Sequence, residues 1–246
     1  MGAAREFYEE LTSTQDRGLE LARAGAPDGT RVVARRQSRG RGRGAHAWDS
    51  PEGGLYLSVV THAPSAGFGL LPLAVGVELA DRLESNWSIR SRLKWPNDVW
   101  VERPGLGVAK LAGILIDSVL GSDGRAVQVV GVGVNVHRPA AALPGPMTIP
   151  PVTLEELVRP CPSLEAVERM AAEGIVAARR DLGSSAAIAE TVRRCRTRLF
   201  GVGRRARAES GPTGTIASLA DDGALLLDVE GGTVALRSGD LTVEVG

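Results

Sequence analysis

The segment from Gly40 to Pro51, GRGRGAHAWDSP, constrains the fold of this chain more than any other stretch. Arginine and glycine alternate at its start, and strand-like runs flank it, Arg31–Arg35 before it and Gly54–Val60 after it. Glycine lets a backbone approach a ligand closely, and arginine presents a rigid fork that matches phosphate and carboxylate oxygens. The pattern therefore predicts a loop between two strands that closes over an anionic ligand.

An alternative interpretation of the same segment is a disordered RNA-binding tail, in which charge and stacking act without a fold. The segment, however, is short, internal and bounded by strands, and the 246-residue chain has a formal net charge of +0. A nucleic-acid binder is expected to carry a broad basic excess. These observations favour the loop and leave RNA binding as an alternative.

Length and composition predict a soluble globular protein with room for one large domain and a small one. The two cysteines, Cys161 and Cys195, lie far apart and form no CxxC pair, which argues against a disulfide scaffold or a zinc ribbon. The N-terminal residues lack the pattern of a signal peptide, and no window is long and apolar enough to span a membrane. We therefore expect a cytoplasmic protein.

Hydrophobic periodicity predicts helices and strands up to about residue 136. A helix begins at Thr12–Thr14 and ends near Ala24, and a second helix runs from Leu70 to about Leu83. Further strands are predicted at Leu93, Val99–Val101, Leu111–Val119 and Val127–Val136. The last two are continuous apolar runs, which is typical of the buried middle of a sheet.

The next part of the chain is predicted to be a proline-rich surface loop followed by two helices. The loop, LPGPMTIPP, begins at Leu143, and its prolines exclude a helix. The helices span about 164–182 and 185–200. Cations near a helix C-terminus complement the helix dipole, so we interpret six arginines as mostly solvated charge: Arg179, Arg180, Arg193, Arg194, Arg196 and Arg198.

After Gly201 the sequence changes to short strands separated by tight turns such as Asp222–Gly223 and Gly231–Gly232. The strands are predicted at Arg204–Ala208, Thr213–Leu219, Ala224–Val229, Thr233–Arg237 and Leu241–Val245. Five strands in so short a segment suggest a small β-barrel. The predicted domains are therefore residues 1–200 and residues 201–246.

Polar residues gather at the predicted start of the first helix, at Thr12, Ser13, Thr14 and Gln15, and Gln37 is a further candidate. Ordinary capping of the helix explains hydroxyls at this position. The functional alternative is a set of hydrogen-bond partners for a small polar head group. Both interpretations stay open on these residues alone.

Two lysine-bearing segments are candidates for charge chemistry. The turn-forming segment 94–98, KWPND, contains Lys94 and ends in Asp98, a carboxylate suited to magnesium. Lys110 opens the apolar run KLAGIL, where a ligand carboxylate or phosphate would supply a negative partner and Gly113 would leave room for it. The structural alternatives are a surface position for Lys94 and a solvent-reaching strand end for Lys110.

A third segment, GVGVN at residues 131–135, places glycines inside a strand, which often marks the close approach of a ligand. It is not the dinucleotide fingerprint GxGxxG, and the chain has no GxxxxGK[ST] phosphate loop. His46, His62 and His137 lack metal-ligand spacing. No Ser-His-Asp or Cys-His arrangement is indicated.

Taken in order, these segments resemble the biotin protein ligases. The matching motifs are STQ (13–15), GRGRGAHAWDSP (40–51), LYLS (55–58), KWPND (94–98), KLAGIL (110–115) and GVGVN (131–135). With the C-terminal strands, the resemblance covers nearly the whole chain. It implies an α+β fold: a mixed β-sheet with helices, related to class II aminoacyl-tRNA synthetases, plus the small C-terminal β-barrel.

The resemblance also implies a two-step reaction. The carboxylate of biotin attacks the α-phosphate of MgATP, which gives biotinyl-5′-AMP and pyrophosphate. A lysine amine of a biotin carboxyl carrier domain then attacks the mixed anhydride and releases AMP. The resemblance therefore implies ATP with Mg²⁺ and biotin as the small molecules, and the carrier domain as the protein partner.

The positions that match the family's motifs take implied roles. The implied catalytic residues are Lys110, Arg43 and Lys94. Biotin would be held by Ser13, Thr14, Gln15, Gln37, Gly40, Arg41 and Gly113. ATP or the adenylate would contact Arg41, Arg43, Trp48, Lys94, Asn97, Lys110 and Asn135, and magnesium would be bound by Asp98.

Two positions depart from the family's pattern. Gln15 stands where asparagine is usual, which preserves an amide, and Ala45-His46 replace the second Gly-Arg of the loop. Arginine is always charged, whereas histidine is mostly neutral at pH 7. We therefore hypothesise that this chain releases its adenylate more readily than relatives that carry arginine.

Three other functions are weighed against the ligase. A lipoate or octanoyl transferase shares the fold but lacks the GRGR pattern and KWPND, and a non-catalytic biotin binder is disfavoured by the presence of Lys110. DNA-binding repression is not expected, because the residues before Thr12 are too few for a helix-turn-helix. A homodimer is a further expectation, and the identity of the carrier is not readable from the sequence.

Overall fold

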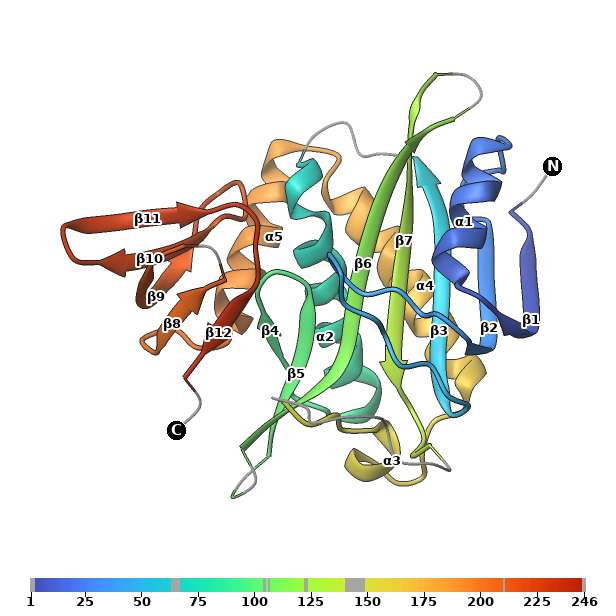
Figure 1. The fold of residues 1–246 in the computed structure, drawn as a ribbon, viewed down its shortest axis with the longest axis horizontal. Coiled ribbons are helices and arrows are strands. Elements are labelled where there is room, and N and C mark those ends of the chain that lie inside the picture. Colours follow the sequence, from blue (N-terminus) through green and yellow to red (C-terminus); the bar gives the residue numbers. More distant parts are fainter. Residues whose placement is uncertain are drawn as a thin grey trace. The chain divides into compact units, whose positions relative to one another are not determined.

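The computed structural model describes residues 3–62, 67–103, 105, 107–121, 124–139, 149–209 and 211–244. Figure 1 shows the helices and strands in chain order from blue to red. The chain divides into two compact units, each made of two segments. Unit 1 consists of Met1–Ala63 and Leu111–Val176, and unit 2 consists of Pro64–Lys110 and Ala177–Gly246. The division into domains 1–200 and 201–246 stays a prediction.

Unit 1 is built on five strands of a mixed sheet. They are β1 (Arg5–Leu11), β2 (Arg31–Gln37), β3 (Gly54–His62), β7 (Ala126–Asn135) and most of β6 (Gly107–Leu120). β1 is parallel to β2, whereas the pairs β2–β3, β3–β7 and β7–β6 are antiparallel. The predicted mixed sheet is confirmed. The sequence did not predict β1, because this edge strand is rich in glutamate and mostly exposed.

Helix α1 (Thr14–Arg23) packs against the sheet through a small apolar cluster. Leu19 and Ala22 are buried in a cluster with Val60 and Val129. Gly18 allows this close approach, because a Cβ atom at that position would lie 2.6 Å from Cγ1 of Val129. The start of α1, where the polar candidates lie, is therefore held firmly beside β7.

Two further helices contribute to unit 1. The four-residue helix α3 (Leu154–Leu157) begins with a capping box formed by Thr153 and Glu156, and it is too short for periodicity to predict. Helix α4 (Leu164–Asp181) starts in unit 1 and matches its prediction. Residues 143–148 of the predicted proline-rich loop lie outside the described residues.

Unit 2 combines two helices with a short hairpin. Its elements are the 3₁₀ turn η1 (Phe68–Leu70), α2 (Leu71–Trp87), β4 (Arg92–Lys94), β5 (Asp98–Arg103), the start of β6 and α5 (Ser185–Arg198). α2 continues past the predicted end and stops where Ser88 adopts a left-handed conformation, with φ 58°. Because β6 continues from unit 2 into unit 1, the strands share one hydrogen-bonded order, β1-β2-β3-β7-β6-β5-β4.

The C-terminal strands are confirmed as an antiparallel sheet within unit 2. The strands are β8 (Arg205–Ala208), β9 (Thr213–Leu219), β10 (Leu225–Val229), β11 (Gly232–Leu236) and β12 (Leu241–Val243). Their order is β11-β10-β9-β8-β12, and Ile216, Leu219 and Leu225 are fully buried among them. The predicted closure of these strands into a barrel is not confirmed.

The cysteines and the membrane prediction can be compared with the structure. Cys161 and Cys195 are both free, and burial raises the pKa of the Cys195 thiol to about 12. A thiol with so high a pKa is unreactive at neutral pH. In the described part of the chain, no helix has the length and apolar character needed to cross a membrane.

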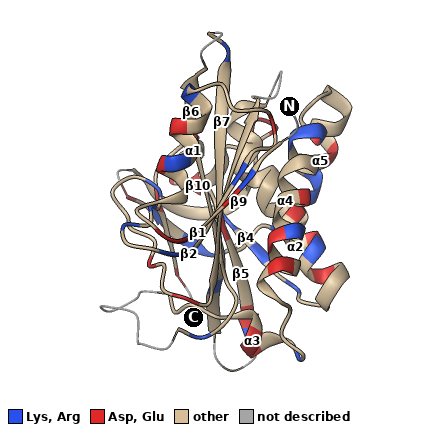
Figure 2. Ribbon diagram, turned by 90° about the vertical axis from the view of Figure 1, so that its right-hand side faces the viewer, with Lys and Arg blue, Asp and Glu red and all other residues tan. Residues whose placement is uncertain are grey.

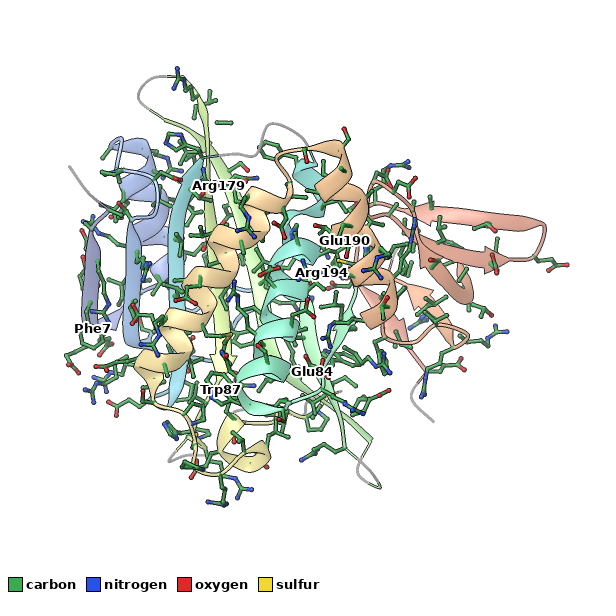
Figure 3. The ribbon with its side chains drawn as sticks, turned by 180° about the vertical axis from the view of Figure 1, so that it is seen from behind. Phe7, Glu84, Trp87, Arg179, Glu190 and Arg194 are labelled. Carbon is green, nitrogen blue, oxygen red and sulfur yellow. The ribbon has the colours of Figure 1, made fainter. Side chains whose placement is uncertain are left out.

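The arginines of α5 are not uniformly solvated, which corrects the prediction for two of them. Charged residues of both signs lie close together on α2 and α5 (Figure 2). Arg194, which Figure 3 labels on α5, contacts Glu78 at 2.6 Å and also pairs with Asp81 and Asp181. Arg198, on the next turn of α5, is the second exception. It pairs with two carboxylates of α2, Asp81 and Glu84.

The network around Arg194 is partly buried. The exposed fraction is 22% for the Arg194 side chain and 10% for Glu78. Burial lowers the pKa of Arg194, but hydrogen bonds to Glu78 and Asp81 outweigh this effect and raise the pKa above its usual value. These side chains therefore join α2 to α5 instead of only capping a helix end.

We expect Arg194→Gln to lower the free energy of unfolding by about 2 kcal/mol, because it removes a cation that pairs with three carboxylates in a partly buried network. Urea denaturation at neutral pH measures the change. The matched control is Arg193→Gln, which removes a 69% exposed side chain paired with Glu190 on the same helix. The control should be as stable as the wild type, and equal losses in the two variants would contradict the structural role of Arg194.

Candidate active site

The polar residues at the start of α1 form an ordered hydrogen-bond network. Ser13 is the N-cap, and its side chain accepts a hydrogen bond from the Gln15 amide nitrogen at 3.2 Å. Thr14 donates to Oε1 of Gln37 through its amide nitrogen at 2.7 Å and through Oγ1 at 3.1 Å. Capping is therefore confirmed, and Gln37 is brought to the helix start as the sequence suggested.

The side chain of Gln15 is fully engaged inside unit 1. Its Nε2 donates to the carbonyl oxygen of Val129 at 2.9 Å and to Oδ2 of Asp117 at 3.1 Å. Its Oε1 accepts a hydrogen bond from Ser58 Oγ at 3.0 Å. A Cβ atom on Gly131 would lie only 2.5 Å from this Oε1. Both amide hydrogens therefore bind the protein, which makes Gln15 a support of the site.

Gln37 joins the helix start to the arginine–glycine loop. Its Nε2 donates to Ser50 Oγ at 2.7 Å, and Ser50 Oγ donates to the carbonyl oxygen of Trp48 at 2.8 Å. Gly40 is buried beside this hydrogen bond. A Cβ atom at position 40 would lie 2.3 Å from Ser50 Oγ and 2.3 Å from the carbonyl oxygen of Trp48. Glycine at position 40 is therefore required by the packing of the loop itself.

The predicted loop is a small hairpin between β2 and β3. Trp48 donates its amide hydrogen to Gly40 at 2.9 Å, and Arg41 forms an isolated bridge with Ala47. Arg43 and His46 close the tip, since the His46 amide donates to the Arg43 carbonyl at 3.1 Å. The two arms of the hairpin are thus paired with each other in a stem, and the tip is exposed.

The indole of Trp48 lies on a pair of glycines in the sheet. Gly113 on β6 and Gly133 on β7 are direct partners in the strand register. A Cβ atom on Gly113 would lie 2.7 Å from Trp48 Cζ3, and one on Gly133 would lie 2.6 Å from Trp48 Cε2. The room that the sequence suggested for a ligand at Gly113 is therefore occupied by the indole.

Arg41 points to two carboxylates of unit 1. Its Nη1 lies 3.0 Å from Asp16 Oδ1 on α1 and 3.1 Å from Asp117 Oδ2 on β6. The exposed fractions are 37% for Arg41, 47% for Asp16 and 27% for Asp117.

Asn135, a predicted adenylate contact, is the last residue of β7 and is the register partner of Gly54 on β3.

The lysine-bearing motif KWPND, residues 94–98, contributes to the β4–β5 hairpin of unit 2. Lys94 and Asp98 are register partners, and residues 95–97 form the turn, so Asn97 lies at its end. Trp95 is buried, and its Nε1 donates to the carbonyl oxygen of Gly223 at 3.1 Å. Lys94 Nζ lies 5.9 Å from the centre of the Trp100 ring, a cation–π contact.

Lys110 has a negative partner within its own unit. Its Nζ lies 2.8 Å from Asp98 Oδ1, and the exposed fractions are 31% for the lysine and 12% for the aspartate. Asp98 therefore supplies a negative partner for Lys110 within the protein, and a contact between Lys110 and a ligand anion stays a prediction. Within the described ranges no cluster of three or more His, Cys, Asp or Glu residues could hold a metal, so magnesium at Asp98 stays a prediction.

Sequence reasoning missed four residues of this network, Asp16, Ser50, Ser58 and Asp117. Asp117 was the most detectable, because a carboxylate in an apolar strand needs a partner. Ser58 follows the same logic, since it is fully buried within the hydrophobic β3. Their partners, however, lie in other segments, and a single sequence does not reveal those pairings.

Comparison with known proteins identifies the family. Residues 8–135 match the Biotin/lipoate A/B protein ligase family. The chain is 30% identical over 250 residues to the Biotin--[acetyl-CoA-carboxylase] ligase of Mycobacterium tuberculosis. This match covers 96% of this chain and 87% of the relative. This chain therefore belongs to the biotin/lipoate A/B protein ligase family, as its motifs suggested.

Two further proteins are similar to this chain in sequence or in fold. The Bifunctional ligase/repressor BirA of Bacillus subtilis is 33% identical over 141 residues, and the match spans 56% of this chain but 42% of that protein. The Biotin protein ligase from Aquifex aeolicus in complex with biotin and ATP has a similar fold, with a TM-score of 0.80 and 26% identity over 99% of both chains. The predicted α+β fold class is confirmed.

We expect Gly133→Ala to destabilise the protein by about 1–3 kcal/mol, because the added methyl would overlap the indole of Trp48. Chemical denaturation measures the loss. Gly69→Ala is the control, since a Cβ atom there would meet no described neighbour closer than 3.9 Å. Wild-type stability of Gly133→Ala would mean that Trp48 is not held tightly on the glycine pair.

Proposed function

We propose that this chain is a biotin ligase that forms biotinyl-5′-AMP from biotin and ATP and transfers biotin to a lysine of a biotin carboxyl carrier domain. The observation that carries the proposal is the match along 96% of the chain to a relative named Biotin--[acetyl-CoA-carboxylase] ligase. The similar fold of a ligase solved in complex with biotin and ATP supports it.

In the first step two anions must meet, the carboxylate of biotin and the α-phosphate of ATP. Cations that offset the charge developing at the phosphate are therefore the main catalytic requirement. We assign this role to Lys110, with Arg43 and Lys94 assisting. Lys110 immediately precedes Leu111, the residue with which the continuous strand β6 enters unit 1.

The lysine content of the chain supports this assignment. Of 29 Lys and Arg residues, two are lysines, and these are Lys94 and Lys110. The other 27 positions use arginine, whose planar fork does not replace a compact ammonium at a defined site. We infer that both motif positions require an ammonium group.

The remaining candidates receive roles in binding. We assign the polar end of biotin to Ser13, Thr14, Gln37 and Gly40, with Gln15 and Gly113 supporting the site from within. We assign the adenylate to Trp48, Asn97 and Asn135. Magnesium usually binds through substrate phosphates and one or two carboxylates, and Asp98 is the carboxylate that we assign to it.

The second step requires protection of the mixed anhydride from water, because hydrolysis competes with attack by the carrier lysine. We propose that the hairpin of residues 40–50 covers the adenylate and excludes water until the carrier arrives. The identity of the carrier and the formation of a homodimer stay predictions.

The test mixes the purified protein with biotin, MgATP and a biotin carboxyl carrier domain, and then probes that domain with streptavidin. We expect labelling, and we expect Lys110→Ala to reduce the rate at least about 100-fold, the usual cost of removing one preorganised charge at a transition state. Pyrophosphate release measures the first step separately.

Two controls accompany this test. Arg90→Gln changes a side chain that is 91% exposed and should keep wild-type activity. Asp98→Asn keeps the lysine but removes both its ion-pair partner and the carboxylate that we assign to magnesium, so comparing it with Lys110→Ala shows whether the ammonium group acts without Asp98. Normal pyrophosphate release by Lys110→Ala would contradict the catalytic role of Lys110. If the wild type activated lipoate but not biotin, the assignment of biotin as the substrate would be wrong.

The departure at Ala45-His46 gives a further prediction. We expect His46→Arg to slow the escape of biotinyl-5′-AMP, because a permanent charge at the tip of the hairpin would hold the phosphate more firmly. The measurement follows the free adenylate in solution when no carrier is present. An unchanged escape rate would disprove the idea that His46 weakens retention.

A further inference from the structure

Arg41 of the hairpin forms ion pairs with two carboxylates of unit 1. One partner, Asp16, lies in the first turn of α1, and the other, Asp117, lies on β6. We propose that Arg41, Asp16 and Asp117 form an ion-pair latch that holds the hairpin of residues 40–50 closed. Resting on the proposed function, we further infer that this latch sets how fast biotinyl-5′-AMP escapes.

The position of Arg41 in the hairpin suits this role. Arg41 lies in the stem, where it bridges to Ala47 and follows Gly40, whose carbonyl accepts from the Trp48 amide. The opposite arm of the stem is fixed by the indole of Trp48 on the glycines of β6 and β7. The latch therefore anchors one arm by charge, while Trp48 anchors the other by packing.

The electrostatics argue against Arg41 as the main anion-binding group. Two carboxylates lie within 3.1 Å of its Nη1, so the local charge of the three side chains is negative. A phosphate approaching this guanidinium would be repelled by both aspartates. Arg43, two residues further along at the tip of the hairpin, is the better candidate for the ligand.

Asp117 also connects the latch to the polar end of the site. The same oxygen, Oδ2, accepts from Gln15 Nε2 at 3.1 Å and pairs with Arg41 at 3.1 Å. Gln15 in turn bonds Ser58, whose Oγ also lies 2.9 Å from Thr14 Oγ1. Opening of the hairpin therefore removes a partner from the carboxylate that supports the helix start. Asp117 is thus a positioning residue.

Partial exposure makes this latch weak and sensitive to salt. Ion pairs between partly exposed side chains contribute modestly and are screened at high ionic strength. A latch of this strength would close the hairpin without trapping the adenylate permanently. The carrier needs such a balance to reach the anhydride.

The first experiment does not depend on activity. Hydrogen exchange of the segment 39–50, followed by mass spectrometry, compares the wild type with Asp117→Asn, Asp16→Asn and the double variant. We expect exchange in the double variant to be about three- to tenfold faster at low salt. In 0.5 M NaCl the exchange rate of the wild type should approach that of the double variant, because salt screens the same ion pairs that the substitutions remove.

The matched control is Glu20→Gln. Glu20 also lies on α1 and pairs with an arginine, Arg17, at 3.0 Å, but neither residue contacts the hairpin in the described structure. Exchange of segment 39–50 should not change in this variant. Asp16 also contributes charge to the first turn of α1, so Asp117→Asn is the variant that tests the latch without altering the helix dipole.

The second experiment measures the dissociation of added biotinyl-5′-AMP from the same variants. We expect dissociation to accelerate about three- to tenfold in the double variant, with less change in the KM for biotin. Faster exchange without any binding of biotinyl-5′-AMP by the wild type would retain the latch and overturn the proposed function. Unchanged exchange at low salt, or acceleration that extends over all of α1 and β6, would overturn the latch.

Discussion

The candidate site in unit 1 depends on how closely other segments can approach strands β6 and β7, and glycine sets that distance. Gly131 and Gly133 lie two residues apart and so share a face of the sheet, and Gly113 is the register partner of Gly133. The amide of Gln15 fills the space over the first glycine, and the indole of Trp48 fills the space over the other two. Any side chain at these positions would separate α1 and the hairpin from the sheet.

This close packing makes the polar residues of the site depend on one another. Gln37 accepts from Thr14 and donates to Ser50, so a single amide links the helix start to the end of the hairpin. Buried polar groups are stable when their partners are supplied, and here the protein supplies many of them itself. The protein therefore supplies many of the partners in this network itself, and such internal support lowers the cost of ordering a site.

The sequence was most informative where a pattern is local. Periodicity predicted α1, α4 and α5, and continuous apolar runs predicted β6 and β7. It failed where long-range partners decide the outcome. Edge strand β1 buries too little to show a pattern, and Arg194 finds Glu78 at a separation of 116 residues. The pairing of Lys110 with Asp98 was missed for a related reason, since the lysine had been assigned to a ligand anion and the aspartate to magnesium.

The structure also distinguishes two arginines that the sequence presents as equivalent. Arg41 and Arg43 are both flanked by glycine, yet one lies in the hairpin stem beside two carboxylates and the other lies at the tip. An RNA-binding segment would need both charges to face a polyanion. Since Arg41 is offset by Asp16 and Asp117, the segment offers far less positive charge than its letters suggest. The arginine–glycine alternation is therefore better explained by a hairpin that folds onto its own protein, with glycines for close packing and one arginine for anchorage.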